Sequence, residues 1–186
     1  MITKISDSVW KVPADSNIYM LEYPERIIID TGSRANRYLL DMFLSKAVDF
    51  SEVKKVFFTH LHYDHIGNFD LFPNAGFFAS EAEIEDFRKS PRGATLADDS
   101  FMDKFNVELK PIPEIEGLEV IQTPGHTRGS VCFWFAKEGV LFTGDTLLNK
   151  GHGRTDLPTS VPGEMQRSLN RLVAYNYRVL ACGHEY

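Results

Sequence analysis

The sequence lacks most features of exported, membrane-spanning or disulfide-bonded proteins. It has two cysteines in 186 residues, too few for a disulfide framework. Cys132 and Cys182 both lie in apolar runs, which favours buried thiols. No stretch approaches the roughly 18 uninterrupted apolar residues of a membrane span, and no apolar signal segment follows Met1. These absences predict a cytoplasmic protein without membrane association.

Basic charge is also scarce. The chain has 20 Lys and Arg against 26 Asp and Glu, a formal net charge of -6, which argues against a general nucleic-acid binder. Hydrophobic residues make up 43% of the chain, enough for a sizeable core. The length fits one domain, and no linker or repeat interrupts it. We therefore expect a single domain over residues 1–186, of undetermined oligomeric state.

Strand-like and helix-like segments predict an α/β fold. Strands are expected over residues 9–12, 17–23, 26–29, 53–59, 75–79, 118–122, 130–135, 140–143 and 178–181. Helices are expected over residues 33–48, 80–89 and 163–174. Residues 90–106 are expected to form a loop with a helical turn, a candidate lid. The order of segments favours two sheets between helical layers over one doubly wound sheet.

Three of the six histidines fall within the segment His60-Leu61-His62-Tyr63-Asp64-His65. His60 and His62 are two residues apart at a strand end, so both imidazoles point to one side and reach one ion. Asp64 and His65 follow where the chain should turn into a helix, and a second ion beside the first would explain them. Imidazole nitrogen and carboxylate oxygen are natural ligands of Zn²⁺. The segment therefore predicts a site for two metal ions.

Three more polar residues share one context, each just after an apolar strand and beside a glycine: His126, Asp145 and His184. Strand ends are rigid, and glycine lets the backbone turn tightly to aim a side chain. Structural zinc sites favour cysteine and close four ligands, whereas here carboxylates join the histidines, so a catalytic centre is favoured. We expect His152 to be a loop residue and Asp30 to orient a ligand or cap its loop.

Residues 59–65 resemble the Thr-His-x-His-x-Asp-His signature of the metallo-β-lactamase superfamily, and the later His, Asp and His follow in the family's order. The resemblance runs from Asp30-Thr31-Gly32 to His184. It implies a four-layer αβ/βα sandwich with the site at one edge. It also implies a first ion held by His60, His62 and His126, a second held by Asp64, His65 and His184, and Asp145 as the bridge. Zinc is the expected metal, with iron or manganese as alternatives.

The same resemblance implies hydrolysis. A bound dication lowers the pKa of water from 15.7 toward about 7, and two ions roughly 3.5–4 Å apart both generate the nucleophile and polarise a carbonyl. The charge of the ions stabilises the oxyanion that forms. Asp64 is the expected catalytic residue, because its carboxylate binds a metal and also aligns the metal-bound hydroxide for attack.

Two C-terminal motifs resemble those of glyoxalase II, the hydroxyacylglutathione hydrolases: Gly151-His152-Gly153-Arg154 and Cys182-Gly183-His184-Glu185-Tyr186. The resemblance implies that Arg154 and Tyr186 bind substrate, and a guanidinium suits a carboxylate of an anionic thioester. Glyoxalase II continues into a helical domain that supplies much of the glutathione contact, whereas this sequence stops at Tyr186. We therefore expect hydrolysis of a small-molecule thioester or related acyl ester whose thiol and acyl group are not fixed.

Three alternatives stay open. Residues 153–156, Gly-Arg-Thr-Asp, also resemble a loop of the persulfide dioxygenases, which use one iron held by two histidines and a carboxylate. Metal content and oxygen uptake would discriminate that reaction from hydrolysis. A β-lactamase is normally exported, and no export signal is visible. A non-catalytic metal-binding module would need its open coordination position blocked.

Overall fold

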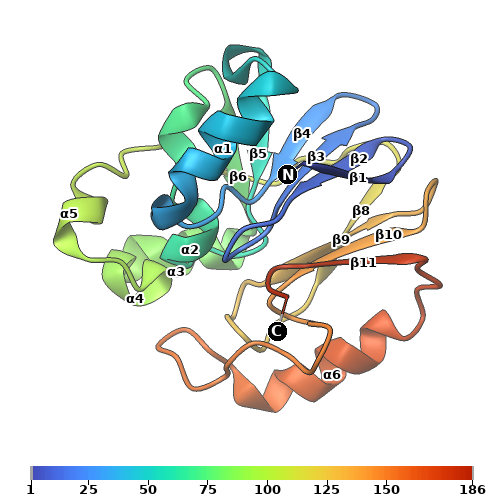
Figure 1. Cartoon of the computed structure of the whole chain (residues 1–186). Helices are drawn as coiled ribbons and strands as arrows, with labels where there is room; N and C mark the ends of the chain where they lie inside the picture. The colour runs from blue at the N-terminus through green and yellow to red at the C-terminus, as the bar shows by residue number, and fades with distance from the viewer. Residues whose placement is uncertain (1, 186) are drawn as a thin grey trace.

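Two β-sheets lie face to face in the computed structural model, which describes residues 2–185 (Figure 1). The first sheet has seven strands that follow one another in chain order. These are β1 Thr3–Ser6, β2 Val9–Val12, β3 Ile18–Glu22, β4 Arg26–Ile29, β5 Lys55–Phe57, β6 Gly76–Ala79 and β7 Leu109–Pro111. Neighbours are antiparallel from β1 to β4 and parallel from β4 to β7.

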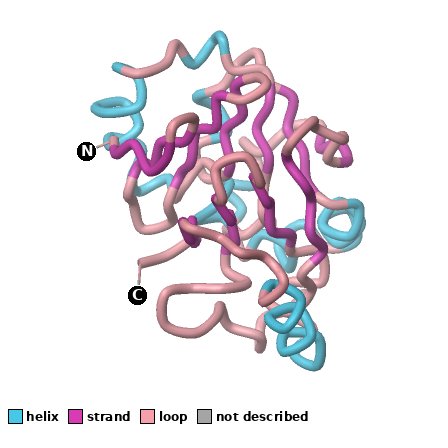
Figure 2. Tube along the Cα trace, turned by 90° about the vertical axis from the view of Figure 1, so that its right-hand side faces the viewer, coloured by secondary structure: helices cyan, strands magenta, loops and turns pink. Residues whose placement is uncertain are grey.

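The second sheet has four strands: β8 Leu118–Gln122, β9 Val131–Phe135, β10 Val140–Gly144 and β11 Val179–Cys182. Their spatial order is β11-β10-β9-β8. β9 is antiparallel to both β8 and β10, and β11 is parallel to β10. β8, β10 and β11 therefore run in one direction, and their carboxyl ends meet at the same edge. Long loops gather at the end of the molecule where the chain finishes (Figure 2).

Helices cover the outer face of each sheet (Figure 1). On the first sheet these are α1 Arg37–Phe43, α2 Tyr63–Ile66, α3 Glu81–Lys89, α4 Pro91–Thr95 and α5 Asp99–Met102. On the second sheet it is α6 Pro162–Leu172. The layers run helix, sheet, sheet, helix, which confirms the predicted αβ/βα sandwich.

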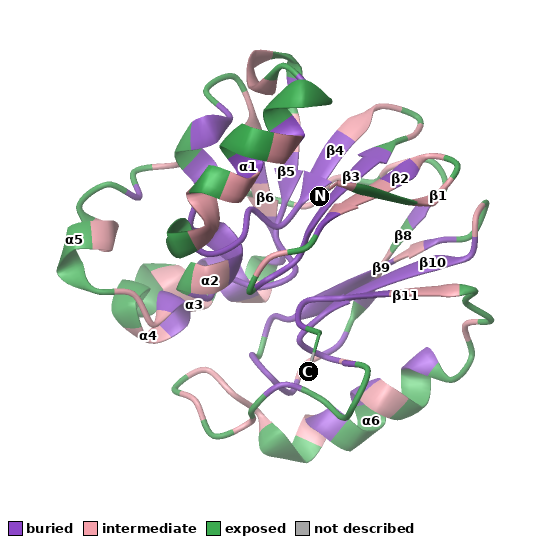
Figure 3. Cartoon of the chain, in the orientation of Figure 1, coloured by how far each residue is buried: buried purple, intermediate pink, exposed green. Residues whose placement is uncertain are grey.

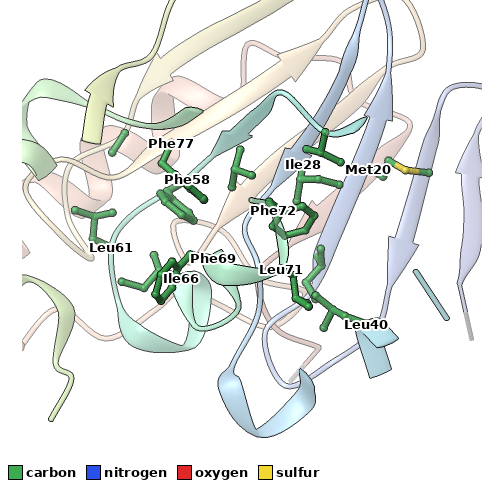
Figure 4. Packing of buried hydrophobic residues seen from close by; sticks show 14 of the residues in the cluster. Met20, Ile28, Leu40, Phe58, Leu61, Ile66, Phe69, Leu71, Phe72 and Phe77 are labelled. Atoms are coloured by element: carbon green, nitrogen blue, oxygen red, sulfur yellow. The ribbon is translucent and has the colours of Figure 1, made fainter. Parts of the chain in front are cut away.

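Three buried apolar layers hold the sandwich together. Each sheet contributes to two of them, because successive strand residues point to opposite faces of a sheet. Ile28 of β4 packs beneath the helices (Figure 4), whereas its neighbours Ile27 and Ile29 face the second sheet. On that sheet, Leu141 of β10 packs with Leu172 of α6. The central strands are consequently buried, while the edge strand β1 and the outer faces of α1 and α6 stay exposed (Figure 3).

The helix expected over residues 33–48 is divided. A 3₁₀ turn at Arg34–Asn36 precedes α1, and another at Leu44–Lys46 follows it. The start of this segment is held by other contacts, because Gly67 N donates to Gly32 O at 3.0 Å and Asn68 Nδ2 donates to Ser33 O at 2.9 Å. The backbone there is therefore not available to begin a regular α-helix.

Other differences lie at the edges of the fold. The expected loop over residues 90–106 contains two short helices, α4 and α5. Strands β1 and β7 were not expected from the sequence, because both are edge strands with exposed residues and no clear apolar pattern. No helix in the described part of the chain is both long enough and apolar enough to cross a bilayer.

Candidate metal centre

The predicted ligands come from both sheets and meet at one edge. His60, His62, Asp64 and His65 lie in and around α2, which follows β5 of the first sheet. In the second sheet, His126, Asp145 and His184 follow the carboxyl ends of β8, β10 and β11. Because those three strands run in one direction, residues far apart in sequence reach the same place. The structure thus brings together all seven residues.

One group consists of three buried imidazoles, His60, His62 and His126. Nε2 of His126 lies 3.2 Å from Nε2 of His60 and 2.9 Å from Nδ1 of His62. The other group consists of Asp64, His65 and His184. Nε2 of His184 lies 3.4 Å from Nε2 of His65 and 3.3 Å from Oδ2 of Asp64. Each group therefore presents three donor atoms to one small volume.

Asp145 lies between the two groups, with one carboxylate oxygen toward each. Its Oδ2 is 3.5 Å from Nε2 of His126 in the first group. Its Oδ1 is 3.3 Å from Nε2 of His65 and 3.4 Å from Nε2 of His184 in the second. Oδ1 is buried without a hydrogen-bond partner among the described residues, although buried carboxylate oxygens are normally satisfied. This oxygen is placed for an ion.

Outer hydrogen bonds direct the inner nitrogens of two histidines toward the centre. Nδ1 of His126 lies 2.7 Å from the carbonyl oxygen of Arg154, and Nδ1 of His184 lies 2.6 Å from that of Asp15. A carbonyl only accepts, so each Nδ1 carries the proton. Nε2 of each ring faces the centre, and in the neutral ring it is an acceptor, which is the tautomer that a metal requires.

Asp30 performs the same function for His65, as the sequence predicted. Its Oδ2 lies 2.8 Å from Nδ1 of His65 and accepts a hydrogen bond from Thr59 Oγ1 at 2.8 Å. Thr59 Oγ1 in turn lies 3.1 Å from Nδ1 of His60. Asp30 adopts a left-handed backbone with φ 57, which is uncommon outside glycine. The strained turn therefore positions a buried carboxylate behind two of the predicted ligands.

The two groups differ in charge. Burial, with the neighbouring histidines, lowers the pKa of His62 to about 3 and holds that of His60 well below its ordinary value. In the second group burial acts in the same direction, but contacts with Asp145 and Asp64 raise the pKa of His184 to about 10. Burial acts to raise the pKa of Asp64, but His65 and His184 outweigh it and lower that pKa to about 2. The first group is neutral. The second combines carboxylates with protonated imidazoles, and a bound dication would displace their protons.

This donor set fits two divalent cations. Nitrogen and oxygen donors without thiolate suit zinc, iron and manganese, and the carboxylate between the groups has an oxygen for each ion. The backbone at Gly183 also leaves space for the shared carboxylate of Asp145. A Cβ built on Gly183 would lie 2.4 Å from Oδ1 of Asp145 and 2.9 Å from Cε1 of His65, so only glycine fits beside the shared carboxylate.

Glu83 is a buried residue of the centre that the sequence did not reveal. Its Oε2 accepts a hydrogen bond from Leu61 N at 2.9 Å, between His60 and His62, and its Oε1 accepts one from Oγ1 of Thr127, beside His126. Glu83 therefore braces both loops that carry the first group. In the sequence it occupies the last position of Ser80-Glu81-Ala82-Glu83, which is typical of a helix cap.

The pKa of Glu83 yields a pH-dependent prediction. Burial is the largest influence and raises the pKa from 4.5 to about 7, against the hydrogen bonds from Thr127 and Leu61. A raised folded-state pKa means that the stability contribution is complete below pH 4.5 and is lost as the pH rises through about 7. The difference corresponds to about 3 kcal/mol. From about pH 4 to about pH 8.5, the free energy of unfolding of the wild type should therefore fall by this amount relative to Glu83→Gln.

Denaturant unfolding of chelator-treated protein at several pH values measures this difference without a contribution from metal binding. Glu81→Gln is the matched control, because Glu81 is an exposed residue of the same helix. A difference in the free energy of unfolding between the wild type and Glu83→Gln that stays constant across this pH range would contradict the prediction.

The two predicted substrate residues do not contact the ligand cluster. The side chain of Arg154 is 70% exposed and pairs with Asp156 at 2.9 Å. Arg154 contacts the centre through its carbonyl oxygen, which lies 2.7 Å from Nδ1 of His126. Tyr186 lies outside the described residues. His152 is an exposed loop residue, as expected. The substrate role of Arg154 and Tyr186 stays a prediction.

Comparisons with known proteins agree with this geometry. Residues 13–184 match the family model of the Metallo-beta-lactamase superfamily. A probable metallo-hydrolase of Streptococcus pyogenes is 30% identical over 86% of this chain and 73% of its own length. A hydroxyacylglutathione hydrolase of a Synechococcus species is 31% identical over 96% of this chain and 68% of its own. The chain spans about half, 46%, of a matching hydroxyacylglutathione hydrolase of Rhodospirillum rubrum.

Solved structures of similar fold agree with these sequence matches. A protein crystallised in a di-iron-bound form superposes with a TM-score of 0.74 and 25% identity, over 92% of this chain and 88% of that one. The chain therefore belongs to the metallo-beta-lactamase superfamily. Within that superfamily it is a metallo-hydrolase.

Proposed function

We propose that the chain hydrolyses a thioester, or a related acyl ester, of a small molecule with the help of two divalent metal ions. The observation that carries this proposal is the position of Asp145, with one oxygen toward each group of donors. One ion would be held by His60, His62 and His126, and the other by Asp64, His65 and His184, with Asp145 shared. Zinc is the proposed metal, with iron or manganese as alternatives.

When bound, such ions supply a nucleophile from water at neutral pH and polarise the carbonyl that is attacked. The chain's own residues prepare this chemistry. The outer hydrogen bonds of His126, His184 and His65 hold the rings in fixed orientations, so little reorganisation is needed. Asp64 is ionised at neutral pH because its pKa is about 2. Its side chain is also 19% exposed, so its carboxylate accepts a hydrogen bond from an entering water.

The thioester part of the proposal is supported by relatives that are named hydroxyacylglutathione hydrolases. Arg154 is the proposed partner for an anionic group of the substrate. Its guanidinium is exposed and already pairs with Asp156, so a substrate carboxylate would exchange with that partner. Because this ion pair is exposed, exchanging its partner costs little free energy.

The test combines elemental analysis with hydrolysis of lactoylglutathione and of simple thioesters, followed through the released thiol. We expect about two equivalents of metal per chain, since the donors form two groups around one shared carboxylate. Chelation should lower turnover at least about 100-fold, and added zinc should restore it. Fully loaded protein that hydrolyses no thioester would overturn the proposal. Oxygen uptake with glutathione persulfide would instead indicate a dioxygenase.

A further inference from the structure

A cavity of about 650 Å³ adjoins the segment that carries the predicted ligands. Tyr63, which stands between His62 and Asp64 in the sequence, forms one wall of the cavity, and 47% of its side chain is exposed. The remaining apolar wall consists of Phe69, Leu96, Ala97 and Phe101. Tyr63 directly precedes Asp64 in α2, so this wall of the cavity is one residue along the chain from a predicted ligand.

Four charged residues line the cavity, and two of them pair with each other. Nη1 of Arg34 pairs with Oδ1 of Asp70 at 2.5 Å. Asp98 caps α5, since its Oδ1 accepts a hydrogen bond from Phe101 N at 2.9 Å. Lys104 also lines the cavity and forms no ion pair with any residue between 2 and 185. The cavity therefore offers an apolar interior, and among its described lining residues Lys104 is the cation left without an ion pair, while the unpaired Asp98 carboxylate is held at the helix terminus.

The wall contains a strained residue. Leu96 ends α4 in the left-handed conformation, with φ 56 and ψ 19. A non-glycine residue in that region costs roughly 1 kcal/mol or more, and such residues concentrate at functional sites. The chain could end α4 with a glycine or asparagine at no such cost. A leucine here instead contributes an aliphatic side chain to the cavity.

We propose that this cavity binds the acyl arm of the substrate, and that this arm is apolar, either an aromatic ring or a medium-length alkyl chain. The inference rests on the proposed thioester hydrolysis. The volume lies within the roughly 300–1,000 Å³ of small-molecule sites, more than a two- or three-carbon acyl group would fill. Lys104 favours substrates with negative charge elsewhere, which agrees with an anionic thioester.

Acyl selectivity tests the proposal in metal-loaded protein. Acetyl, hexanoyl and phenylacetyl thioesters of 3-mercaptopropionate would be compared through their kcat/KM values. A buried methylene is worth about a fourfold preference, so the hexanoyl-to-acetyl ratio should exceed about 10 in the wild type. Ala97→Phe, which fills the cavity, should lower this ratio at least about tenfold. Ala174→Phe, at an exposed position beyond α6, should leave it unchanged.

The charge is tested separately. Lys104→Gln should lower kcat/KM for thioesters of the anionic 3-mercaptopropionate by about threefold to tenfold. Thioesters of the neutral 2-mercaptoethanol should show no such loss. An equal loss for both thiols would mean that Lys104 does not contribute through its charge.

Binding of the neutral probe phenylacetamide separates this inference from the proposed function. In a titration with this probe, the amide NMR shifts of residues 96–104 should change in the wild type and not in Ala97→Phe. If the probe binds there but no thioester is hydrolysed, the proposed function fails and the cavity remains an acyl-type site. If thioesters are hydrolysed without acyl preference and the probe does not bind, the inference is overturned alone. A change of oligomeric state in Ala97→Phe would also overturn it, since the cavity would then be an interface.

Discussion

Asp145→Ala is expected to lower turnover at least about 1,000-fold while the chain stays folded. Asp145 offers one oxygen to each group of donors, so its loss removes a donor from both ions at once. It also removes one of the anions that balance His65 and His184, so the pKa of each imidazole should fall, although Asp30 and Asp64 still act on His65 and Asp64 on His184. The variant should therefore bind less than two equivalents of metal, and the remaining ion should bind more weakly.

Metal content, kcat and circular dichroism on the same preparations distinguish a lost centre from a lost fold. Asp41→Ala is the matched control, since Asp41 is exposed on α1 and distant in sequence from every predicted ligand. His62→Ala should likewise abolish turnover, although it removes a ligand from the first group alone. Activity retained by purified Asp145→Ala at full metal loading would show that the shared carboxylate is not needed.

Gly183→Ala is expected to have the second largest effect, a loss of about 100-fold in kcat with weaker binding of metal in the second group. The added Cβ would lie 2.4 Å from Oδ1 of Asp145 and 3.0 Å from the carbonyl carbon of Gly144. The Gly144 backbone belongs to β10 and cannot easily move, so the carboxylate must turn away. Gly183 has no left-handed backbone, so the effect arises from space and not from backbone strain.

Gly163→Ala is a suitable control, because a Cβ there meets nothing within 4 Å. Titration of both chelator-treated variants with zinc, followed by calorimetry, measures the affinity of each ion separately. Thermal unfolding of the same samples shows whether the fold is retained. Wild-type affinity and activity in Gly183→Ala would mean that the second group does not depend on the orientation of Asp145.

The sequence predicted the fold class and the position of the site because both depend on local patterns. His60 and His62 have strand spacing, and His126, Asp145 and His184 each follow an apolar strand beside glycine. Parallel strand direction then places the ends of β8, β10 and β11 together. Spacing indicated two ions, and the resemblance to a known family added which of the later residues joins each group and which one is shared.

Glu83 shows why the rest was not predictable. An acidic residue three positions after Ser80 is typical of a capping box, in which the carboxylate returns to its own helix terminus. Ser80 does cap α3, since its Oγ accepts from Glu83 N at 3.2 Å. However, the carboxylate of Glu83 turns toward Leu61 and Thr127. Those partners are remote in sequence, so only the tertiary structure distinguishes a helix cap from a brace between ligand loops.

The origin of the donors in two different sheets has a consequence for the stability of the whole sandwich. Each group combines residues that follow the first sheet with one that follows the second, such as His60 with His126 and His65 with His184. An ion bound in either group would therefore add a further link between two layers that meet through apolar side chains and a few hydrogen bonds, such as that from Tyr19 OH to Cys182 O at 2.7 Å. Separation of the layers would require release of the ions. Metal occupancy and the cooperativity of unfolding are thus expected to be one linked equilibrium.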